Sequence, residues 1–284
     1  TVNKSAKGFC DLILGDGGVV DKWSKLGVKG WRLDVVDELP IDFTDKLCAR
    51  IRSEGDDMLV VGEVWEDASV KIAYSEWRPY FMGEQLDSVM NYPFKEAILS
   101  YVLNGDKNAF IADVTAVLEH YPKQSLDVLM NLVDSHDTAR AITVLSGVKP
   151  PYSKKDRADF TLSCEQYDLA KRRLKVASAL QYTLPGVPCV FYGDEAGKQG
   201  FEDPLNRGTY PWGREDTDLI EHYRALGKIR EKYKDLLQGE THFVKDSDKL
   251  VFERVCADGV LRVESQGLWL SISVNGKVVM SINK

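Results

Sequence analysis

The sequence lacks the features that would place it directly in several large classes of protein. No stretch of its 284 residues approaches the roughly 20 consecutive apolar residues of a transmembrane helix. The net charge of −7 argues against nucleic acid or an anionic membrane as the main partner. No signal peptide is recognisable at the start. No glycine-rich phosphate loop occurs, so no organic cofactor is implied.

Cysteine is present but follows no pattern. The five cysteines are scattered, odd in number and free of any C-x-x-C pair, which argues against a zinc site or dithiol chemistry. We expect no metal site, and thiols that are reduced and mostly buried. This favours a reducing or anaerobic setting and, among compartments that the sequence leaves open, the cytoplasm. The cysteines are Cys10, Cys48, Cys164, Cys189 and Cys256.

The pattern of apolar residues changes at Gly239. The composition, 44% hydrophobic and 29% charged, is that of a soluble globular protein with a substantial core. Before Gly239, short apolar runs alternate with helical patterns, which predicts βα units around a parallel sheet. After it, period-two alternation and the turn signals Asp258-Gly259 and Asn275-Gly276 predict antiparallel strands. We predict an α/β domain over residues 1–239 and a small β domain, complete or partial, over 240–284.

Individual elements follow from the same patterns. Two prolines and many charges predict a long surface loop over 145–165. The predicted strands of the first domain cover 30–36, 58–64, 86–90, 126–132 and 187–192. The predicted helices cover 18–26, 41–54, 67–76, 93–121 with a break near Gly105, 167–184 and 216–237.

Each predicted strand of the first domain ends in polar residues. In a (β/α) barrel the strand ends share one face, and that face carries the active site. Asp34, Glu63 and Asp137 would therefore converge although they are far apart in the sequence. The polar residues at the five strand ends are Asp34, Glu63, Asn91 with Tyr92, His136 with Asp137, and Asp194 with Glu195.

Three carboxylates around one cleft suit the hydrolysis of a glycosidic bond. In the segment GWRLDVVDELP, alternation places Arg32 and Asp34 on one face, which suits an anionic nucleophile held by an arginine. A retaining mechanism needs such a nucleophile and an acid about 5 Å apart. A third carboxylate can stabilise positive charge that develops on the sugar. Aromatic rings that could stack on sugar faces are Trp65, Tyr92, Tyr192 and Trp212.

Each of these features also has a purely structural interpretation. Arg32 and Asp34 could form a structural ion pair, and Glu63 could be a charge that ends a strand. Ser135 or Asp137 could cap a helix over 138–145. Asp203 with Arg207 could be a surface pair, and Asp194-Glu195 could simply terminate a strand. The joint placement at successive strand ends favours the functional interpretation.

Several segments together resemble the α-amylase superfamily, glycoside hydrolase family thirteen. GWRLDVVDE resembles its second conserved region, VVGEVW the third and NLVDSHD the fourth. GVPCVFYGDEAG is similar to the last barrel strand and the loop after it. The resemblance covers about residues 10–240 and implies strands four to eight, with their helices, of a (β/α)8 TIM barrel, followed by a C-terminal β domain.

The resemblance implies a role for each matching residue. Asp34 would be the nucleophile that forms a covalent glycosyl-enzyme, and Glu63 the general acid and then base. Asp137 would stabilise the distorted sugar, Arg32 would hold Asp34, and His136 would bind the same ring. Further sugar contacts are predicted for Trp65, Asp37 and Glu38 on the leaving-group side, for Asp203 and Arg207 on the non-reducing side, and for Asn91 and Tyr92.

The details are similar to the neopullulanase, cyclomaltodextrinase and amylopullulanase branch. Asp37-Glu38 and the segment DPLNRGTYPWG carry this likeness. We therefore expect a retaining hydrolase of α-glucosidic bonds in maltooligosaccharides, cyclodextrins or pullulan. The alternatives are a transglycosylase of the same family and a non-catalytic carbohydrate-binding or scaffold protein. An α-glucan is the expected partner, with no nucleic acid or membrane.

The family's first conserved region has no counterpart in this sequence. We expect barrel strands one to three, and the inserted domain that often binds structural calcium, to be missing. Five barrel strands alone would leave two unpaired edges. We therefore expect low stability and weak activity, or pairing with the missing N-terminal half or with another copy of the chain.

Overall fold

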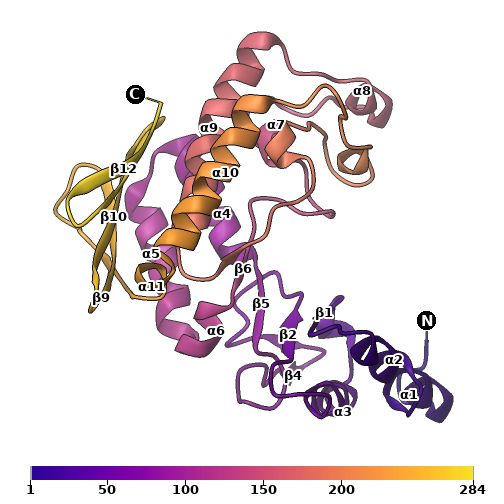
Figure 1. Ribbon diagram of the computed structural model, residues 1–284. Coiled ribbons are helices and arrows are strands. Elements are labelled where there is room, and N and C mark those ends of the chain that lie inside the picture. Colours follow the sequence, from indigo (N-terminus) through magenta and orange to yellow (C-terminus); the bar gives the residue numbers. More distant parts are fainter. Residues whose placement is uncertain (1, 284) are drawn as a thin grey trace. The chain divides into compact units, whose positions relative to one another are not determined.

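The structure, a computed structural model, describes residues 2–283 in two compact units (Figure 1). The first unit comprises the chain up to Pro93 together with Ala116–Met130, and the second comprises Phe94–Thr115 and the chain from Asn131 onward. The predicted domain boundary between residues 239 and 240 divides the chain differently and stays a prediction.

Three parallel strands form the sheet of the first unit. They are β1 (Gly30–Leu33), β2 (Leu59–Gly62) and β5 (Ser88–Asn91), in that order. Leu33 pairs with Gly62, and Gly62 pairs with Val89, so β1 and β2 end at the same level and β5 continues beyond it to Asn91. The helices wholly within this unit are α1 (Lys7–Leu14), α2 (Val19–Lys25), α3 (Ile41–Arg52) and α6 (Lys123–Asp127), and η1 (Val36–Glu38) is a single 3-10 turn.

The spacing of apolar residues explains these elements. In α3, Phe43, Leu47 and Ile51 recur at intervals of four and are buried, as in an amphipathic helix that packs on a core. In β2, the consecutive residues Val60 and Val61 are both buried, as expected of a parallel strand covered on both faces. Gly62 lies so close to Leu86 that an added Cβ would approach its Cδ1 to 2.5 Å.

The helix predicted over 67–76 is wrong. The structure has a hairpin there, formed by β3 (Ile72–Ala73) and β4 (Glu76–Trp77), with Ile72 paired to Trp77. Tyr74 and Ser75 at its turn have φ angles of 55° and 63°. Two successive residues with positive φ form a tight hairpin turn, which the helix-like spacing of Val70 and Ala73 does not reveal.

Long helices dominate the second unit. α9 (Cys164–Thr183) begins with a capping box, in which Ser163 and Gln166 exchange side-chain and backbone hydrogen bonds of 3.2 and 2.9 Å. α4 (Tyr92–Asn104) and α5 (Lys107–His120) contribute residues to both units and are separated at Gly105, as predicted. The remaining helices are α7 (Ala141–Leu145), α8 (Lys154–Ala158), α10 (Thr217–Lys232) and α11 (Lys234–Leu237), with 3-10 turns η2 (Asp194–Ala196) and η3 (Leu205–Arg207).

The last two parallel strands are much shorter than predicted. The expected strand over 126–132 is mostly wrong: its first residues end α6, and only β6 (Met130–Asn131) is extended. The expected strand over 187–192 is reduced to β7 (Val187–Pro188). The side chain of Gln181 contacts both segments: its Nε2 donates to the carbonyls of Asn131 and Cys189 at 3.0 and 2.9 Å, and the N–H of Cys189 donates to the same Asn131 carbonyl at 2.7 Å.

The C-terminal residues form a five-stranded antiparallel meander, drawn in yellow in Figure 1. Leu261, Val263 and Ile272 point into its packed face and are fully buried. Together with the parallel strands and their helices, this sheet confirms the predicted fold class. Its strands are β8 (Glu240–Phe243), β9 (Leu250–Cys256), β10 (Gly259–Gln266), β11 (Trp269–Val274) and β12 (Lys277–Ile282).

Arg254 of β9 joins the meander to two helices of the same unit. Its side chain is buried, and its guanidinium donates to the carbonyls of Thr183 and Gly239, both at 3.0 Å, and to that of Leu237. These carbonyls lie at or just beyond the ends of α9 and α11, where helical carbonyls lack partners.

The burial of the cysteines tests one expectation from the sequence. The thiols are free, but only Cys48 is buried, while Cys164 and Cys189 are exposed, so the prediction of mostly buried cysteines is wrong. Cys164 occupies the first turn of α9, where polar neighbours set its exposure. Within residues 2–283, every helix is too short or too polar to cross a membrane.

Candidate active site

Asp34 and Glu63 lie side by side at the carboxyl edge of the parallel strands. Because Leu33 pairs with Gly62, the residues that follow them, Asp34 and Glu63, leave the sheet at the same level. The guanidinium of Arg32 contacts both carboxylates: Nη1 pairs with Asp34, and Nη2 lies 2.8 Å from Oε2 of Glu63. The Asp34 side chain is 76% exposed and that of Glu63 only 4%. One arginine therefore holds an accessible carboxylate and a shielded one.

Two further groups fix the orientation of Glu63. The backbone N–H of Val35 donates to Oε2 at 2.8 Å, and the indole Nε1 of Trp65 donates to Oε1 at 3.0 Å. Val35 has a φ of 41°, a rare conformation for a β-branched residue. Such strain persists only where the surroundings enforce it, and here it aims an N–H at a carboxylate.

An aromatic pair borders these carboxylates. The rings of Trp65 and Tyr92 are stacked, with centroids 4.3 Å apart and planes inclined by 11°. Tyr92 is almost fully buried, and Trp65 is about half exposed. One part of the Trp65 ring is therefore accessible to solvent, whereas the buried ring of Tyr92 packs against it. Asn91 is fully buried at the end of β5.

Asp37 and Glu38 are bound to the β3–β4 hairpin. The carboxylate of Asp37 accepts a hydrogen bond of 2.6 Å from the hydroxyl of Tyr80 and lies 3.0 Å from Nζ of Lys71. The hydroxyl of Tyr74 donates to Glu38. Burial and the bond to Asp37 raise the pKa of Tyr80 far above its ordinary value, so its hydroxyl remains a donor. Asp37 is thus bound within the protein, whereas the carboxylate of Glu38 is held by the exposed Tyr74.

In the second unit, the loop after β6 brings His136 and Asp137 together. Nε2 of His136 lies 3.0 Å from Oδ2 of Asp137. Nη2 of Arg207 lies 3.3 Å from Oδ1 of Asp137, and its Nε lies 2.5 Å from Asp203. The pair predicted at Asp203 and Arg207 therefore exists, and it is connected to Asp137 and to the backbone of His136.

Sequence reasoning missed Asn206, which fixes this loop. Its side chain is fully buried, and its Nδ2 donates to the carbonyls of Ser135, His136 and Thr138 at 3.2, 2.8 and 2.6 Å. The signal was available, because an asparagine beside a predicted pair of charges in a glycine- and proline-rich loop is a common loop-fixing residue.

A buried charge cluster behind the loop was also missed. Nη1 of Arg140 lies 3.0 Å from Oδ1 of Asp194, and both side chains are fully buried. Oδ1 of Asp134 and Oδ2 of Asp194 are buried without a hydrogen-bond partner, and the pKa of both carboxyl groups is raised by burial, which favours one proton shared between them. Burial and the neighbouring Asp134 raise the pKa of Asp194 well above its ordinary value. Asp194 therefore does more than end a strand.

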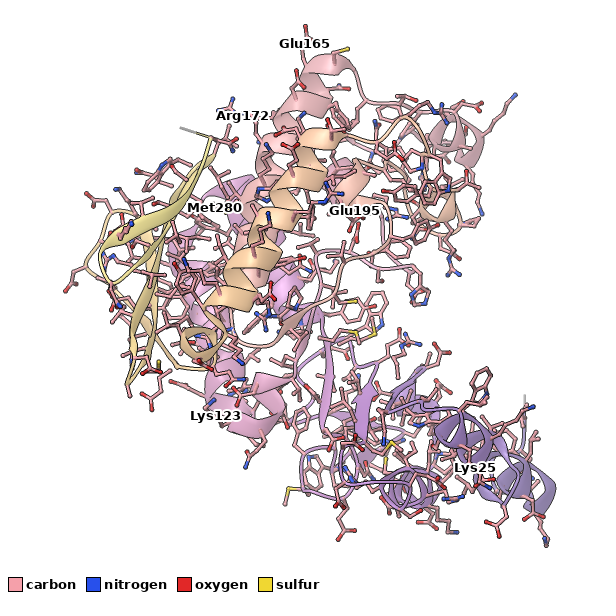
Figure 2. The ribbon with its side chains drawn as sticks, in the orientation of Figure 1. Lys25, Lys123, Glu165, Arg172, Glu195 and Met280 are labelled. Atoms are coloured by element: carbon pink, nitrogen blue, oxygen red, sulfur yellow. The ribbon has the colours of Figure 1, made fainter. Side chains whose placement is uncertain are left out.

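The alternative interpretation of this loop, as a cap for the helix that follows it, is wrong. The helix α7 begins at Ala141, and neither Ser135 nor Asp137 caps it. Instead, Oδ2 of Asp134 accepts a hydrogen bond of 2.6 Å from the N–H of Ala141. Glu195, labelled in Figure 2, accepts a hydrogen bond from the N–H of Gly193 at 2.9 Å at the start of η2.

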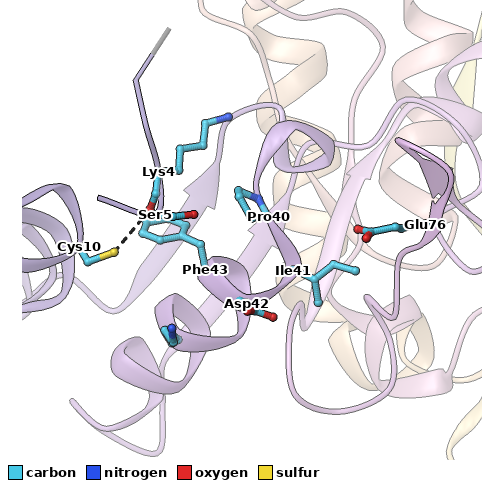
Figure 3. Close-up of a pocket in the computed structure, with 9 residues that line it drawn as sticks. Lys4, Ser5, Cys10, Pro40, Ile41, Asp42, Phe43 and Glu76 are labelled. Atoms are coloured by element: carbon cyan, nitrogen blue, oxygen red, sulfur yellow. Dashed lines mark hydrogen bonds between the residues drawn. The ribbon is translucent and has the colours of Figure 1, made fainter. Parts of the chain in front are cut away.

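A separate hollow of about 460 Å³ in the first unit contains none of the predicted site residues (Figure 3). The first residues of α3 and the segment around Lys4 line it. In the described part of the chain, no three His, Cys, Asp or Glu side chains gather as metal ligands would.

Comparisons with known proteins show which family the chain belongs to. A family model of the α-amylase catalytic domain matches residues 14–243. An amylopullulanase from Thermoanaerobacter thermohydrosulfuricus is 33% identical over 83% of this chain and 16% of its own length. Neopullulanase 2 from Thermoactinomyces vulgaris is 33% identical over 89% of this chain and 40% of its own length.

A solved structure of a cyclomaltodextrinase superposes with a TM-score of 0.75 at 29% identity, over 93% of this chain and 41% of that one. The chain thus spans less than half the length of each of these relatives. The resemblance inferred from the sequence motifs is confirmed: the chain belongs to the α-amylase family, and the part that matches its catalytic domain includes Asp34, Glu63 and Asp137.

Proposed function

We propose that this chain carries the catalytic carboxylates of a retaining hydrolase of α-glucosidic bonds. The observation that carries this proposal is the double contact of Arg32 with Asp34 and Glu63. A single guanidinium spans only a few ångströms, so both carboxylates lie within reach of one sugar ring. That closeness is required of a retaining pair, in which one group attacks the anomeric carbon and the other protonates the leaving oxygen.

The environments of the two carboxylates support different roles. Asp34 is exposed and attacks C1 of the bound sugar, which forms the covalent glycosyl-aspartate and breaks the C1–O bond. Glu63 is shielded and fixed by Val35 and Trp65, and it donates its proton to the departing oxygen. Glu63 then takes a proton from water, which attacks C1 and releases Asp34.

The remaining predicted residues would bind the sugar. Asp137 and His136 offer a carboxylate and an imidazole to sugar hydroxyls, and Asp203 and Arg207 hold Asp137 in place. Trp65 offers its exposed face to a ring. Among the predicted contacts, we assign Asn91, Tyr92 and Asp37 to support of the site, because all three are bound within the protein and largely covered.

The names of the relatives support an α-glucan substrate. They are an amylopullulanase, a neopullulanase and a cyclomaltodextrinase, and we propose maltooligosaccharides, cyclodextrins or pullulan as substrates of the whole protein. Transfer of the glycosyl group to a sugar instead of water is the second candidate. It is favoured by Glu38 and the hairpin bound to it, which offer polar groups to a sugar acceptor.

The first unit has an edge that suits further βα units. Among the described residues, β1 pairs with β2 on one side only. The helices before it leave Leu12, Trp23 and Leu26 largely exposed. Because the relatives are more than twice as long, we propose that additional βα units, from a longer chain or another copy, cover this edge.

Trapping of the covalent intermediate tests the catalytic proposal. The chain, alone and within any longer protein that carries it, is incubated with 5-fluoro-α-D-glucosyl fluoride, whose glycosyl-enzyme hydrolyses slowly. Peptide mass spectrometry should find the added sugar on Asp34, and Asp34→Asn should abolish it. An adduct on another residue, or glucan turnover without any adduct, would contradict the assigned nucleophile. Glucan binding without turnover would support the scaffold alternative.

A further inference from the structure

The turn of the β3–β4 hairpin is strained in a way that needs an explanation. Tyr74 and Ser75 both have positive φ, at 55° and 63°. Asparagine and glycine are the usual residues in such a turn, and a bulky aromatic residue there is an outlier. Unfavourable backbone conformations of this kind concentrate at functional sites. The turn therefore holds Tyr74 in a place that local preferences alone would not choose.

The base of the hairpin is fixed by a buried arginine. The guanidinium of Arg78 donates to the carbonyls of Leu39 and Asp37 at 2.9 and 3.1 Å. The side chain of Arg78 is almost fully buried. Tyr80 and Lys71 add two side-chain contacts to Asp37, as described above. The hairpin and η1, which begins two residues after Asp34, therefore form one rigid piece.

Tyr74 itself is held out into solvent. Its side chain is 67% exposed, and its hydroxyl donates to Oε1 of Glu38. The bond to Glu38 raises the pKa of Tyr74, so the phenol stays protonated. An exposed ring beside a carboxylate and a phenol offers both a stacking face and two polar groups, which is the combination that sugars require.

We propose that Tyr74 extends the sugar contact already predicted for Glu38 on the leaving-group side and is a specificity-determining residue there. This inference rests on the proposed function, because the site serves the glucan that Asp34 and Glu63 would cleave. The ring of Tyr74 packs against the sugar, and the phenol orients the Glu38 carboxylate toward a sugar hydroxyl. The anchored hairpin keeps both groups in position before the sugar arrives.

Binding of a sulfur-linked maltotriose, which the enzyme does not hydrolyse, tests the inference by calorimetry. Loss of the exposed hydrogen bond that orients the Glu38 carboxylate predicts about a 3- to 10-fold weaker affinity for Tyr74→Phe. Tyr74→Ala also removes the ring, which predicts an affinity that is more than 10-fold weaker. Tyr152→Phe removes a hydroxyl from a fully exposed tyrosine and should leave the affinity unchanged.

Thermal unfolding separates binding from folding. All three variants should melt within a few degrees of the unaltered chain, because Tyr74 has little buried surface. In a double-mutant cycle, Tyr74→Phe and Glu38→Ala should be less than additive in their effect on affinity, since each breaks the same contact. Equal affinity in the chain and in Tyr74→Ala, or strict additivity, would overturn the inference.

Turnover of ordinary maltotriose by the same preparations distinguishes this inference from the proposed function. If maltotriose is hydrolysed and all variants bind with equal affinity, the proposed hydrolase function stands and the role of Tyr74 is overturned. If Tyr74→Phe binds more weakly but maltotriose is not hydrolysed, the hydrolase function is overturned and the sugar site at Tyr74 stands. A chain that binds no glucan would overturn both.

Discussion

The indole of Trp65 donates a 3.0 Å hydrogen bond to the carboxylate of Glu63, two residues before it. The same indole is stacked on the buried ring of Tyr92. Glu63 is thus oriented by a side chain that is itself held by packing, which is how an active site keeps a proton donor in register with its substrate.

Glu63→Gln and Asp34→Asn should separate the two catalytic roles. Each should lower hydrolysis of a maltooligosaccharide by about 10³-fold or more. With α-glucosyl fluoride, whose leaving group needs no proton, Glu63→Gln should recover the first step, whereas Asp34→Asn should not. Fluoride release in single-turnover experiments measures that step. Recovery in both variants, or in neither, would contradict the assignment.

Arg32→Lys should reduce activity with little effect on stability. A lysine ammonium is a single point charge, so it cannot hold Asp34 and Glu63 in the fixed geometry of a guanidinium. We expect glucan hydrolysis to fall about 10²-fold. The matched control is Arg262→Lys, since Arg262 also bridges two carboxylates, those of Glu253 and Glu264, on the C-terminal sheet. An equal loss in the control would show a nonspecific effect.

His222 should make the second unit sensitive to mild acid. Burial lowers its pKa from 6.5 to about 4, and Lys175 adds to the effect while Asp218 opposes it. The unfolded chain therefore binds a proton that the folded chain does not, so stability is lost as the pH falls from 6.5 towards 4. The loss from this residue is on the order of 3 kcal/mol. Urea unfolding at several pH values measures it, and His222→Gln should flatten this dependence.

The buried carboxyl pair should have the opposite pH dependence. Because burial and Asp134 raise the pKa of Asp194, the folded chain keeps a proton that the unfolded chain loses. The contribution of this pair to the free energy of unfolding is fully present below pH 4 and decreases as the pH rises towards the raised pKa. Asp134→Asn removes the need for that proton while an amide oxygen can still cap α7.

The melting temperature of Asp134→Asn, relative to the unaltered chain, should therefore increase with pH above 4. Comparison with the unaltered chain cancels the contribution of His222. Asp258→Asn, at an exposed hairpin turn, is the control and should show no such trend. A difference that stays constant with pH would exclude the shared proton.

Asp34 and Glu63 could be predicted as neighbours from the sequence, because the ends of strands have a recognisable pattern. GWRLD and VVGE each combine an apolar run with an abrupt charge, and parallel pairing then aligns the two ends. The hairpin of Tyr74 was not predictable, because strands of two residues have no periodicity and its turn lacks asparagine and glycine.

Contacts between distant residues were the other limit. Arg140 and Asp194 are 54 residues apart, and the local sequence around either residue does not predict that they form an ion pair. Gln181 of α9 likewise donates to the carbonyl of Asn131, a residue 50 positions earlier in the sequence. Local propensity cannot anticipate such tertiary contacts.

Arg254 has a consequence for attempts to recombine relatives. Its guanidinium terminates two helices from within a strand of the meander, so the meander supplies the caps that those helices lack. A chimera takes its last forty-odd residues from another family member. Its carbonyls at the ends of α9 and α11 would lack a donor unless that member has a cationic side chain at the position of Arg254. Whether such a chimera folds should therefore depend more on the residue at the position of Arg254 than on the overall identity between the exchanged segments.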